Sequence, residues 1–247
     1  MNEVPGQRRR AWMTLIMAST LALACAAVAA VTAGAAVTEL TRGPSRAELD
    51  RAVAAETAGR WRAWPAGRIF PETVGYAAEQ GGREQAHRVG ISPETRCDRA
   101  VDPGLREALR RTGCRGVLRA TYIDALQGVV VTVGVVAFAG EREAARAKAA
   151  LPRTGRPSPG LLALGFPGTV TDRFTAVGRQ RGLVRQAGPY VVMTTVGQVD
   201  GRPGKAVGEQ RPTIFAFTGD IADRILAGLA TPERPDCGSE SAGRWRC

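Results

Sequence analysis

The sequence predicts an α+β protein with one N-terminal transmembrane helix, followed by a mainly antiparallel sheet with helices on one face. Three observations lead to this prediction. An uncharged stretch of 28 residues, 11–38, follows a run of arginines near the N-terminus. Two β-rich runs, 128–138 and 189–199, each precede a segment with helical features. Four cysteines lie beyond the apolar stretch.

The apolar stretch is long enough to cross a bilayer. As a helix it extends about 42 Å at ~1.5 Å per residue, which exceeds the roughly 30 Å of a hydrocarbon core. Arg8, Arg9 and Arg10 precede it, and basic residues favour the cytoplasmic side. We therefore expect residues 1–10 to be a cytoplasmic tail, residues 11–38 to be a single-pass anchor in the cell membrane, and the remainder to be extracytoplasmic.

Three alternatives to a retained anchor stay open. Cleavage after Ala33-Gly34-Ala35, whose small residues suit signal peptidase, would release a secreted protein. The apolar run before that site is longer than the usual run of about 7–15 residues, which favours retention. Lipidation of Cys25 is disfavoured because Ala22-Leu23-Ala24 is a poor lipobox. The third alternative is a buried helix of a cytosolic protein.

The chain is strongly basic. Its formal net charge is +11, and the N-terminal tail accounts for only two of these charges. A basic surface raises the rate of encounter with anionic partners, which outside a bacterium are lipid headgroups or wall polymers. A solvated arginine-rich surface without a specific ligand is the alternative. No nucleic-acid partner is expected, because no binding motif is present.

Residues 39–64 are predicted to form a linker and a juxtamembrane helix. Ser45 and Glu48 have the spacing of a capping box, in which each residue bonds the backbone amide of the other, and the helix should run to about Arg62. Polar–apolar periodicity marks one helical face, formed by Leu49, Val53, Thr57, Trp61 and Trp64. This face is expected to pack against the domain that follows, with partner or membrane-surface contact as the alternative.

Residues 65–232 are predicted to form the extracytoplasmic α+β domain. Its first part is mixed in character, with a short helix expected near 83–89. A second helix should begin at Pro103, because Asp102 is a suitable N-cap and proline is favoured at the first helical position. Gly113 should end this helix.

The domain contains two similar stretches that indicate a duplication. RGVLR at 115–119 recurs as RGLVR at 181–185, and Thr-Val-Gly at 132–134 recurs at 195–197. Val, Ile, Thr and Tyr enrich the runs that follow, which favours strands. Predicted helices follow the two runs, at 141–151 and 220–229. Two strand–strand–helix repeats would give a four-stranded, mainly antiparallel sheet with helices on one face.

Cys97, Cys114, Cys237 and Cys247 are predicted to form two structural disulfides, since an even number of cysteines in an exported domain indicates a disulfide framework. Three pairings are open. Pairing between sequence neighbours is favoured, because Cys97 and Cys114 flank a predicted helix, while Cys237 and Cys247 would staple the tail, 233–247. A zinc site is disfavoured, because zinc-binding cysteine pairs are typically about two to four residues apart.

The sequence offers few catalytic candidates. His87 is the only histidine, which excludes a multi-histidine metal site, and no serine has the Gly-x-Ser-x-Gly surroundings of a nucleophile elbow. The glycine-containing segment 201–205 lacks the spacing of a phosphate loop. We predict neither a metal nor a cofactor. Four carboxylates lie near predicted strand ends or helix starts, where turn formation and capping explain them: Asp124, Asp172, Asp200 and Asp220.

Arg119 and Arg185 are the candidate ligand-binding residues. They occupy equivalent positions in the two repeats, so their guanidinium groups are expected to converge on one anionic ligand. Arginine suits this role because its planar fork matches carboxylate and phosphate groups. Solvated strand faces are the alternative explanation for both residues.

The plan of the chain resembles that of uncharacterised single-pass membrane proteins of high-GC Gram-positive bacteria, the actinobacteria. The resemblance lies in Arg8–Arg10, the 11–38 anchor and the four outer cysteines. Lys148 and Lys205 are the only lysines, which is typical of a GC-rich genome. The plan also resembles the extracytoplasmic sensor domains of mycobacterial serine/threonine kinases, which are α+β with two disulfides. This chain contains no kinase domain, so no functional residue carries over from them.

These observations predict a non-catalytic, membrane-anchored envelope protein whose outer domain binds another protein or an anionic envelope component. Two alternatives remain. One is an envelope hydrolase that uses paired carboxylates for acid–base chemistry, and the other is an accessory subunit of a membrane or secretion complex. A polar cavity with two close carboxylates would favour the hydrolase, whereas a shallow apolar or arginine-lined groove would favour binding.

Overall fold

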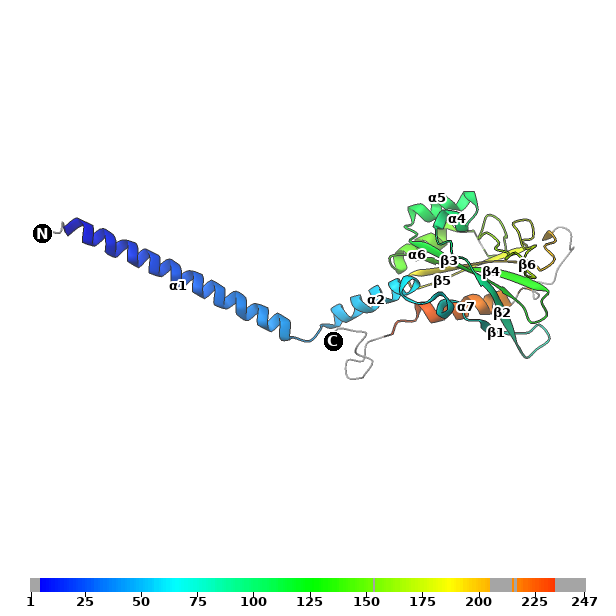
Figure 1. Cartoon of the computed structure of the whole chain (residues 1–247), viewed down its shortest axis with the longest axis horizontal. Coiled ribbons are helices and arrows are strands. Elements are labelled where there is room, and N and C mark those ends of the chain that lie inside the picture. The colour runs from blue at the N-terminus through cyan, green and yellow to red at the C-terminus, as the bar shows by residue number, and fades with distance from the viewer. Residues whose placement is uncertain (1–4, 153, 205–214, 216, 234–247) are drawn as a thin grey trace. The chain divides into compact units, whose positions relative to one another are not determined.

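The first compact unit of the chain is dominated by a long helix. The structure, a computed structural model (Figure 1), describes residues 5–152, 154–204, 215 and 217–233. The chain divides into two compact units. The first consists of Met1–Glu48 and Asp236–Cys247, and the second is Leu49–Pro235. Helix α1 spans Pro5–Thr41. Within it, Leu15–Glu39 is long and apolar enough to cross a membrane, and none of that stretch is buried within the protein. The predicted N-terminal apolar helix is confirmed.

Hydroxyl groups along α1 are satisfied within the helix itself. The side chains of Ser19, Thr20, Thr32 and Thr38 each donate a hydrogen bond to a backbone carbonyl three or four residues earlier. Such internal pairing is what a hydrocarbon environment requires, because it offers no water to polar groups. These four residues are therefore compatible with a membrane span.

Helix α2 (Arg46–Ala63) begins at the predicted capping box. The Ser45 amide donates to Glu48 Oε2 at 2.7 Å, and the Glu48 amide donates to Ser45 Oγ at 3.3 Å. Further along, Val53 and Thr57 are buried and Trp61 packs against the main core, which confirms the predicted packing face. From Leu49 onward the helix belongs to the same compact unit as the sheet, so the predicted domain boundary at residue 65 falls inside that unit.

Arg60 fastens α2 to the end of helix α7 (Phe217–Ala230). Its side chain is only 1% exposed. Nη1 donates to the carbonyls of Leu229 at 3.0 Å and Thr231 at 2.8 Å, while Nε lies 2.9 Å from both carboxylate oxygens of Glu56. Nη2 also lies 2.8 Å from Glu56 Oε2, outside hydrogen-bond geometry, so that contact is an ion pair. A cation placed on the last carbonyls of a helix satisfies orphan acceptors and complements the helix dipole.

The domain is built on a six-stranded sheet in the order β1-β2-β3-β4-β6-β5, with every neighbouring pair antiparallel. All nine residues of β4 are buried, because helices and loops cover both faces of the sheet. The strands are β1 (Thr73–Ala77), β2 (Arg83–Ile91), β3 (Gly116–Ile123), β4 (Val129–Ala137), β5 (Arg181–Ala187) and β6 (Tyr190–Gln198).

The helices lie on both faces of the sheet (Figure 1). Helix α7 packs on one face with odd-numbered β4 residues such as Val133, and α3 (Ala66–Ile69) contacts it. The opposite face, which includes Val136, carries α4, α5 and α6. These three helices span Cys97–Ala100, Pro103–Arg111 and Glu141–Ala150. The α+β class and the antiparallel sheet are confirmed, but the expectation of helices on one face only is wrong.

The two predicted strand–strand–helix units are present as β3-β4-α6 and β5-β6-α7. Their inner strands lie side by side, and Thr132 pairs directly with Thr195, its counterpart in the repeat. A two-fold axis through this pair would relate the inner strands. The helices break that symmetry, because α6 and α7 pack on opposite faces.

Strand β2 occupies the segment near 83–89 where a short helix was expected, so that prediction is wrong. Its Arg, Glu, Gln and Ala residues have good helix propensity, but propensity is a weak prior that tertiary pairing overrides. Here β2 pairs with β1 on one side and β3 on the other, with His87 opposite Thr73 and Ile123. Only Ala86 is buried in the strand, which explains why the sequence lacks a clear β pattern.

Helix α5 has the predicted Pro103 start, and Gly113 follows its end with a positive φ of 80°. The Asp102 side chain does not cap the helix. It forms a paired contact with Arg179, with Oδ2 2.8 Å from Nη1 and Oδ1 3.1 Å from Nη2, and also accepts from the Gly160 amide. Burial raises the pKa of Asp102, but the hydrogen bonds from Arg179 and Gly160 outweigh this and leave the pKa below its ordinary value.

Replacement of Arg60 by methionine should lower the free energy of unfolding by about 3 kcal/mol, because it leaves two helix carbonyls and the Glu56 carboxylate without their buried partner. Arg62→Met is the matched control. Arg62 is exposed and lies over the Trp61 ring at 4.6 Å, so its loss should cost no more than about 1 kcal/mol. Urea unfolding of the full chain in detergent, followed by tryptophan fluorescence, measures both. Equal losses in the two variants would contradict a special role for Arg60.

Candidate functional site

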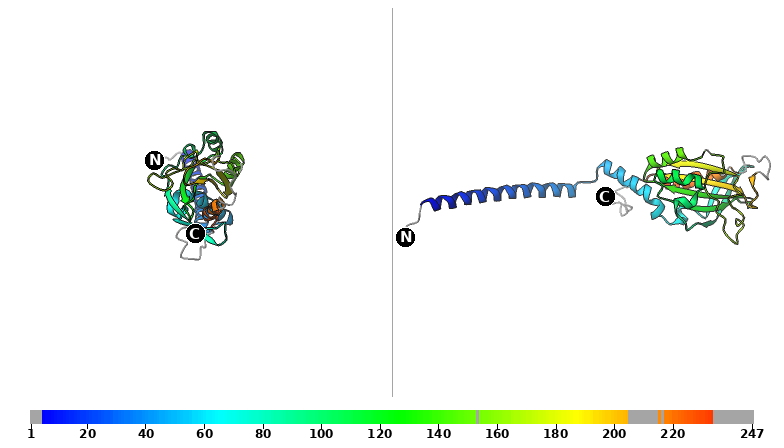
Figure 2. Two further views of the ribbon diagram at one scale, coloured as in Figure 1. Left: turned by 90° about the vertical axis from the view of Figure 1, so that its right-hand side faces the viewer. Right: turned by 90° about the horizontal axis from the view of Figure 1, so that it is seen from above.

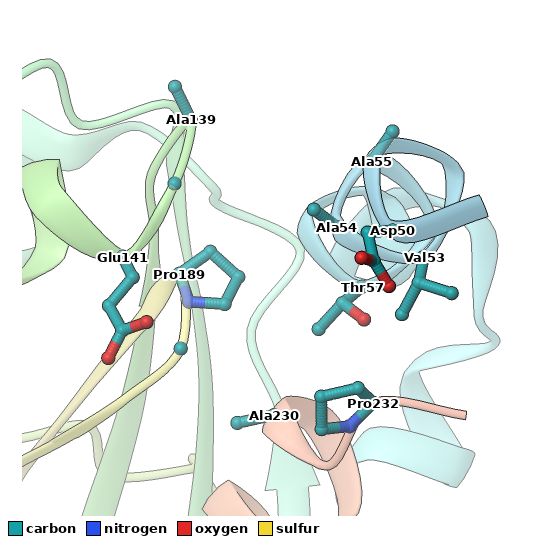
Figure 3. Close-up of a pocket in the computed structure, with 12 residues that line it drawn as sticks. Asp50, Val53, Ala54, Ala55, Thr57, Ala139, Glu141, Pro189, Ala230 and Pro232 are labelled. Carbon is teal, nitrogen blue, oxygen red and sulfur yellow. The ribbon is translucent and has the colours of Figure 1, made fainter. Parts of the chain in front are cut away.

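An apolar groove lies at the end of the sheet where α2 packs (Figure 3). Its volume is about 520 Å³, within the range typical of ligand pockets. One wall is α2, and the other walls are the β4–α6 connection, the β5–β6 turn and the end of α7. Figure 2 shows α2 meeting one end of the strands. The lining residues are Asp50, Val53, Ala54, Ala55, Thr57, Ala139, Gly140, Glu141, Gly188, Pro189, Ala230 and Pro232.

Small and rigid residues keep the groove open. Val53 and Ala54 on α2 are short, so the helix packs near the turn without filling the space between them. Opposite, Gly188 turns the chain between β5 and β6 with a positive φ of 48°, a conformation that glycine adopts without steric cost. A Cβ at Gly188 would lie 3.5 Å from the Ala230 Cβ, so this turn fits closely against the end of α7. The shape of these groove walls therefore depends mainly on the backbone, because short side chains line them.

Thr57 places an unpartnered hydroxyl at the groove. The residue is 5% exposed, and its Oγ1 has no hydrogen-bond partner among the residues that the structure describes. Threonine hydroxyls within helices commonly bond the carbonyl four residues earlier, as Thr32 and Thr38 of α1 do here. Figure 3 shows the Thr57 side chain on the side of α2 that faces the groove. A buried hydroxyl without a partner is unfavourable, and this oxygen is enclosed by the protein.

The backbone of Thr57 is held in place by Tyr190 at the start of β6. The Tyr190 hydroxyl donates to the Thr57 carbonyl at 2.6 Å and accepts from the Trp61 amide at 3.3 Å. Burial raises the pKa of Tyr190 to about 12, so the phenol stays protonated and remains a donor at neutral pH. The wall that carries the free hydroxyl is thus fixed relative to the sheet.

Two carboxylates stand at the rim of the groove. Asp50 lies on α2 and Glu141 is the first residue of α6, so they flank the groove from opposite sides (Figure 3). Both residues are exposed. Among the described residues, neither arginine nor lysine lines the groove, although the chain as a whole carries a net charge of +11.

A second cavity, of about 900 Å³, lies at the opposite end of the central strands and contains three of the four aspartates identified in the sequence. Asp124 Oδ1 accepts from the amides of Gly128 and Val129, both at 2.8 Å, which is turn formation. The hydrogen bond from Arg202 lowers the pKa of Asp200, opposite to the shift that a general acid needs. Asp172 also lines this cavity, which includes Arg173 as well.

The fourth aspartate, Asp220, has a structural role. Its Oδ2 accepts from the Ala77 amide of edge strand β1 at 2.8 Å, which satisfies a donor that the sheet leaves unpaired. His87 is exposed on β2, and the Ser92 hydroxyl interacts with the backbone of Glu94. Among the described residues there is no cluster of three metal-ligating side chains.

Searches of family models, curated proteins and solved structures give no match to this chain.

Arg119 and Arg185 lie on opposite faces of the sheet, so the prediction that they converge on one ligand is wrong. Arg119 pairs with Gly134, whose face carries α4 to α6, whereas Arg185 pairs with Val192, which faces α7. Strands β4 and β6 separate them. The repeat alignment missed this because β5 is shifted in register relative to β3, and a shift of one residue reverses the face of every side chain.

The two arginines also differ in environment. Arg119 is 6% exposed, and within the described part of the chain its Nε has no hydrogen-bond partner. Burial lowers the pKa of Arg119, while nearby Glu94 opposes that shift. Arg185 is 43% exposed, with Nε 3.6 Å from Asp223 Oδ1. Arg185 thus lies at a solvated strand edge, which is the alternative stated for it from the sequence.

The predicted Cys97–Cys114 disulfide is present. It joins the start of α4 to Cys114, three residues after the end of α5, and packs against the core cluster under α4 to α6. Cys237 and Cys247 lie outside the described residues. Cys25 is exposed on α1.

The residues of the groove escaped the sequence analysis because no motif marks them. Thr57 was assigned to the packing face of α2, and it does lie there. The one available signal was a polar residue in the middle of an otherwise apolar face. Glu141 and Pro189 become neighbours of α2 only through the tertiary fold, so their role was not visible in the sequence.

Removal of the disulfide in a Cys97→Ala/Cys114→Ala variant should lower the free energy of unfolding by about 3 kcal/mol, because the bridge closes a loop with a sequence separation of 17. Urea unfolding of the non-reduced full chain in detergent measures the change. Cys25→Ala, on α1, is the matched control and should leave the midpoint unchanged. A double variant as stable as the wild type would contradict the stabilising role of the bridge.

Proposed function

We propose that this chain is a single-pass membrane protein whose extracytoplasmic α+β domain binds another protein through the groove between α2, α7 and the β5–β6 turn. The observation that carries the proposal is an apolar groove of about 520 Å³ with an unpartnered buried hydroxyl. Apolar concave sites with a few polar groups are the usual form of binding sites. Arg60 fixes α2 to the end of α7, so the walls of the groove belong to the folded domain.

The charge of the rim favours a protein partner over an anionic envelope component at this site. The exposed Glu141 disfavours phosphate headgroups and anionic wall polymers at the rim, since like charges at a contact are unfavourable. The carboxylates of the second cavity give weaker support to a hydrolase, because Asp124 and Asp200 are engaged in turn and side-chain contacts. Binding is therefore the function that the geometry supports best.

The orientation of the chain is proposed from its charges and its disulfide. The Arg8–Arg10 run favours a cytoplasmic N-terminus, and the Cys97–Cys114 bridge is typical of an oxidising compartment outside the cytoplasm. A retained α1 would tether the domain, whereas cleavage after Ala35 would release it.

Alkaline phosphatase fused to the C-terminus should be active in cells, because this enzyme requires an oxidising compartment for its disulfides. An epitope placed at the N-terminus should remain on the membrane-bound protein. An inactive phosphatase fusion, together with a fluorescent cytosolic-type reporter at the same end, would contradict the orientation. Release of the domain without the epitope would instead indicate a cleaved signal peptide.

Blocking the groove should prevent partner binding. With p-benzoylphenylalanine in place of the exposed Ala139, irradiation of intact cells should give a discrete cross-linked product. Ala54→Trp, which adds a bulky side chain at an exposed groove position, should reduce that product at least about fivefold. Ala52→Trp, on α2 but outside the groove lining, is the matched control and should not.

A product that Ala54→Trp leaves unchanged would contradict binding through the groove, and so would the absence of any product. A product that purifies in a fixed ratio with this chain would identify it as an accessory subunit of a complex.

A further inference from the structure

We infer that Arg119, on β3, binds a small oxyanion of the carboxylate or phosphate class through the two terminal nitrogens of its guanidinium group. The residue does not line the groove, so this inference goes beyond the proposed function and does not depend on it. Three observations support it: the burial of the side chain, the lack of a partner for its charge within the described residues, and the exposure that remains at its tip.

The charge of Arg119 is buried without a counter-charge in contact. The residue is 6% exposed, and a guanidinium group stays protonated at neutral pH. Within the described residues its side chain forms no hydrogen bond or ion pair. The other two arginines that are buried in this part of the chain, Arg60 and Arg179, each contact a carboxylate. Since a buried charge is unfavourable without a partner, Arg119 calls for an anion that the described chain does not supply.

The terminal nitrogens are the part of Arg119 that a ligand can reach. Nε is the one nitrogen of this side chain that is both enclosed and unpartnered. Nη1 and Nη2 also lack partners in the described part of the chain but are not enclosed, so they contribute to the exposure that remains. The N–H groups at the tip of a guanidinium can pair end-on with two oxygens of a carboxylate or phosphate. The enclosed Nε takes no part in this contact.

The fold holds the Arg119 side chain in place on the face that carries α4 to α6. Arg119 pairs with Gly134 of β4, which has no side chain of its own. Leu161 fills that space, since a Cβ at Gly134 would lie 2.5 Å from Leu161 Cδ1. On the other side, the Ser92 amide donates to the Arg119 carbonyl at 2.8 Å, so the segment that leads to α4 begins beside β3. Because so little of Arg119 is exposed, the site suits a small anion and not a long chain.

Glu94 is the acidic residue that acts electrostatically on Arg119, but it does not bond the guanidinium group. Its Oε1 accepts from the Arg96 amide at 3.0 Å and lies 3.7 Å from Arg96 Nε. Glu94 is thus engaged by a neighbouring arginine, and the tip of Arg119 is left for another anion. A bound oxyanion would be attracted by Arg119 and repelled by Glu94, so the two residues should have opposite effects on binding.

The test measures thermal unfolding of the full chain in dodecyl maltoside. Sodium phosphate or sodium acetate is added, and sodium chloride at matched ionic strength is the reference. A ligand that binds the folded state raises the melting temperature with its concentration. At least one oxyanion should raise it more than chloride, which has no pair of oxygens, and the larger shift identifies the preferred class. Phosphate also stabilises proteins non-specifically, so the difference between wild type and variant is the readout.

Three variants separate binding from a structural role. Arg119→Met should lower the apparent oxyanion affinity at least about tenfold, the worth of charge-assisted hydrogen bonds. In chloride alone it should be as stable as the wild type or more stable, because it removes a buried charge without a partner. Glu94→Gln removes a repulsive charge and should strengthen oxyanion binding roughly two- to fivefold. Arg185→Met, at a solvated strand edge, is the matched control and should bind as the wild type does.

Equal stabilisation of the wild type and Arg119→Met by both oxyanions would overturn the inference. A loss of stability in chloride that Arg119→Met and Glu94→Gln share would also overturn it, because Glu94 would then be the structural partner of Arg119. If Arg119→Met does not fold, Glu94→Gln decides alone, and unchanged or weaker oxyanion binding counts against the site. None of these results bears on the groove, which the cross-linking experiment tests separately.

Discussion

The buried guanidinium of Arg60 joins the first helix of the domain to the last one. The Arg60 side chain is only 1% exposed. It binds both the Glu56 carboxylate and the backbone carbonyls of Leu229 and Thr231 at the end of α7. A buried charge is tolerated only when its hydrogen bonds are well satisfied, so α2 and α7 have little freedom to move apart. The groove lies between these two helices and the β5–β6 turn, and its shape depends on this contact.

A second contact fixes α2 against the sheet. Tyr190 begins β6, which lies between β4 and the edge strand β5, and bonds the backbone of Thr57 and Trp61 through its hydroxyl. The helix that continues the chain after α1 is therefore part of the folded domain from Leu49 onward. A binding event at the groove acts directly on this helix, because residues of α2 form one of its walls.

Charge distributes unevenly over the protein. The chain is basic overall, yet the groove rim carries Asp50 and Glu141, and the second cavity combines Asp124, Asp172 and Asp200 with arginines. In the second cavity, Asp124 accepts hydrogen bonds that form a turn, and Asp200 pairs with Arg202. At the groove, the exposed Glu141 borders an apolar site. This difference is why the groove is the better candidate for recognition.

The sequence by itself determined the elements whose signals are local. The capping box of α2, the proline start of α5 and the strands around 128–138 and 189–199 follow from short-range backbone chemistry and side-chain pattern. The Cys97–Cys114 pair follows from its short spacing around a helix. The tertiary structure decided the rest, because register and face depend on partners distant in the chain. It turned the helix-prone segment 83–91 into a strand, placed Arg119 and Arg185 on opposite faces, and brought Thr57 and Glu141 to one groove.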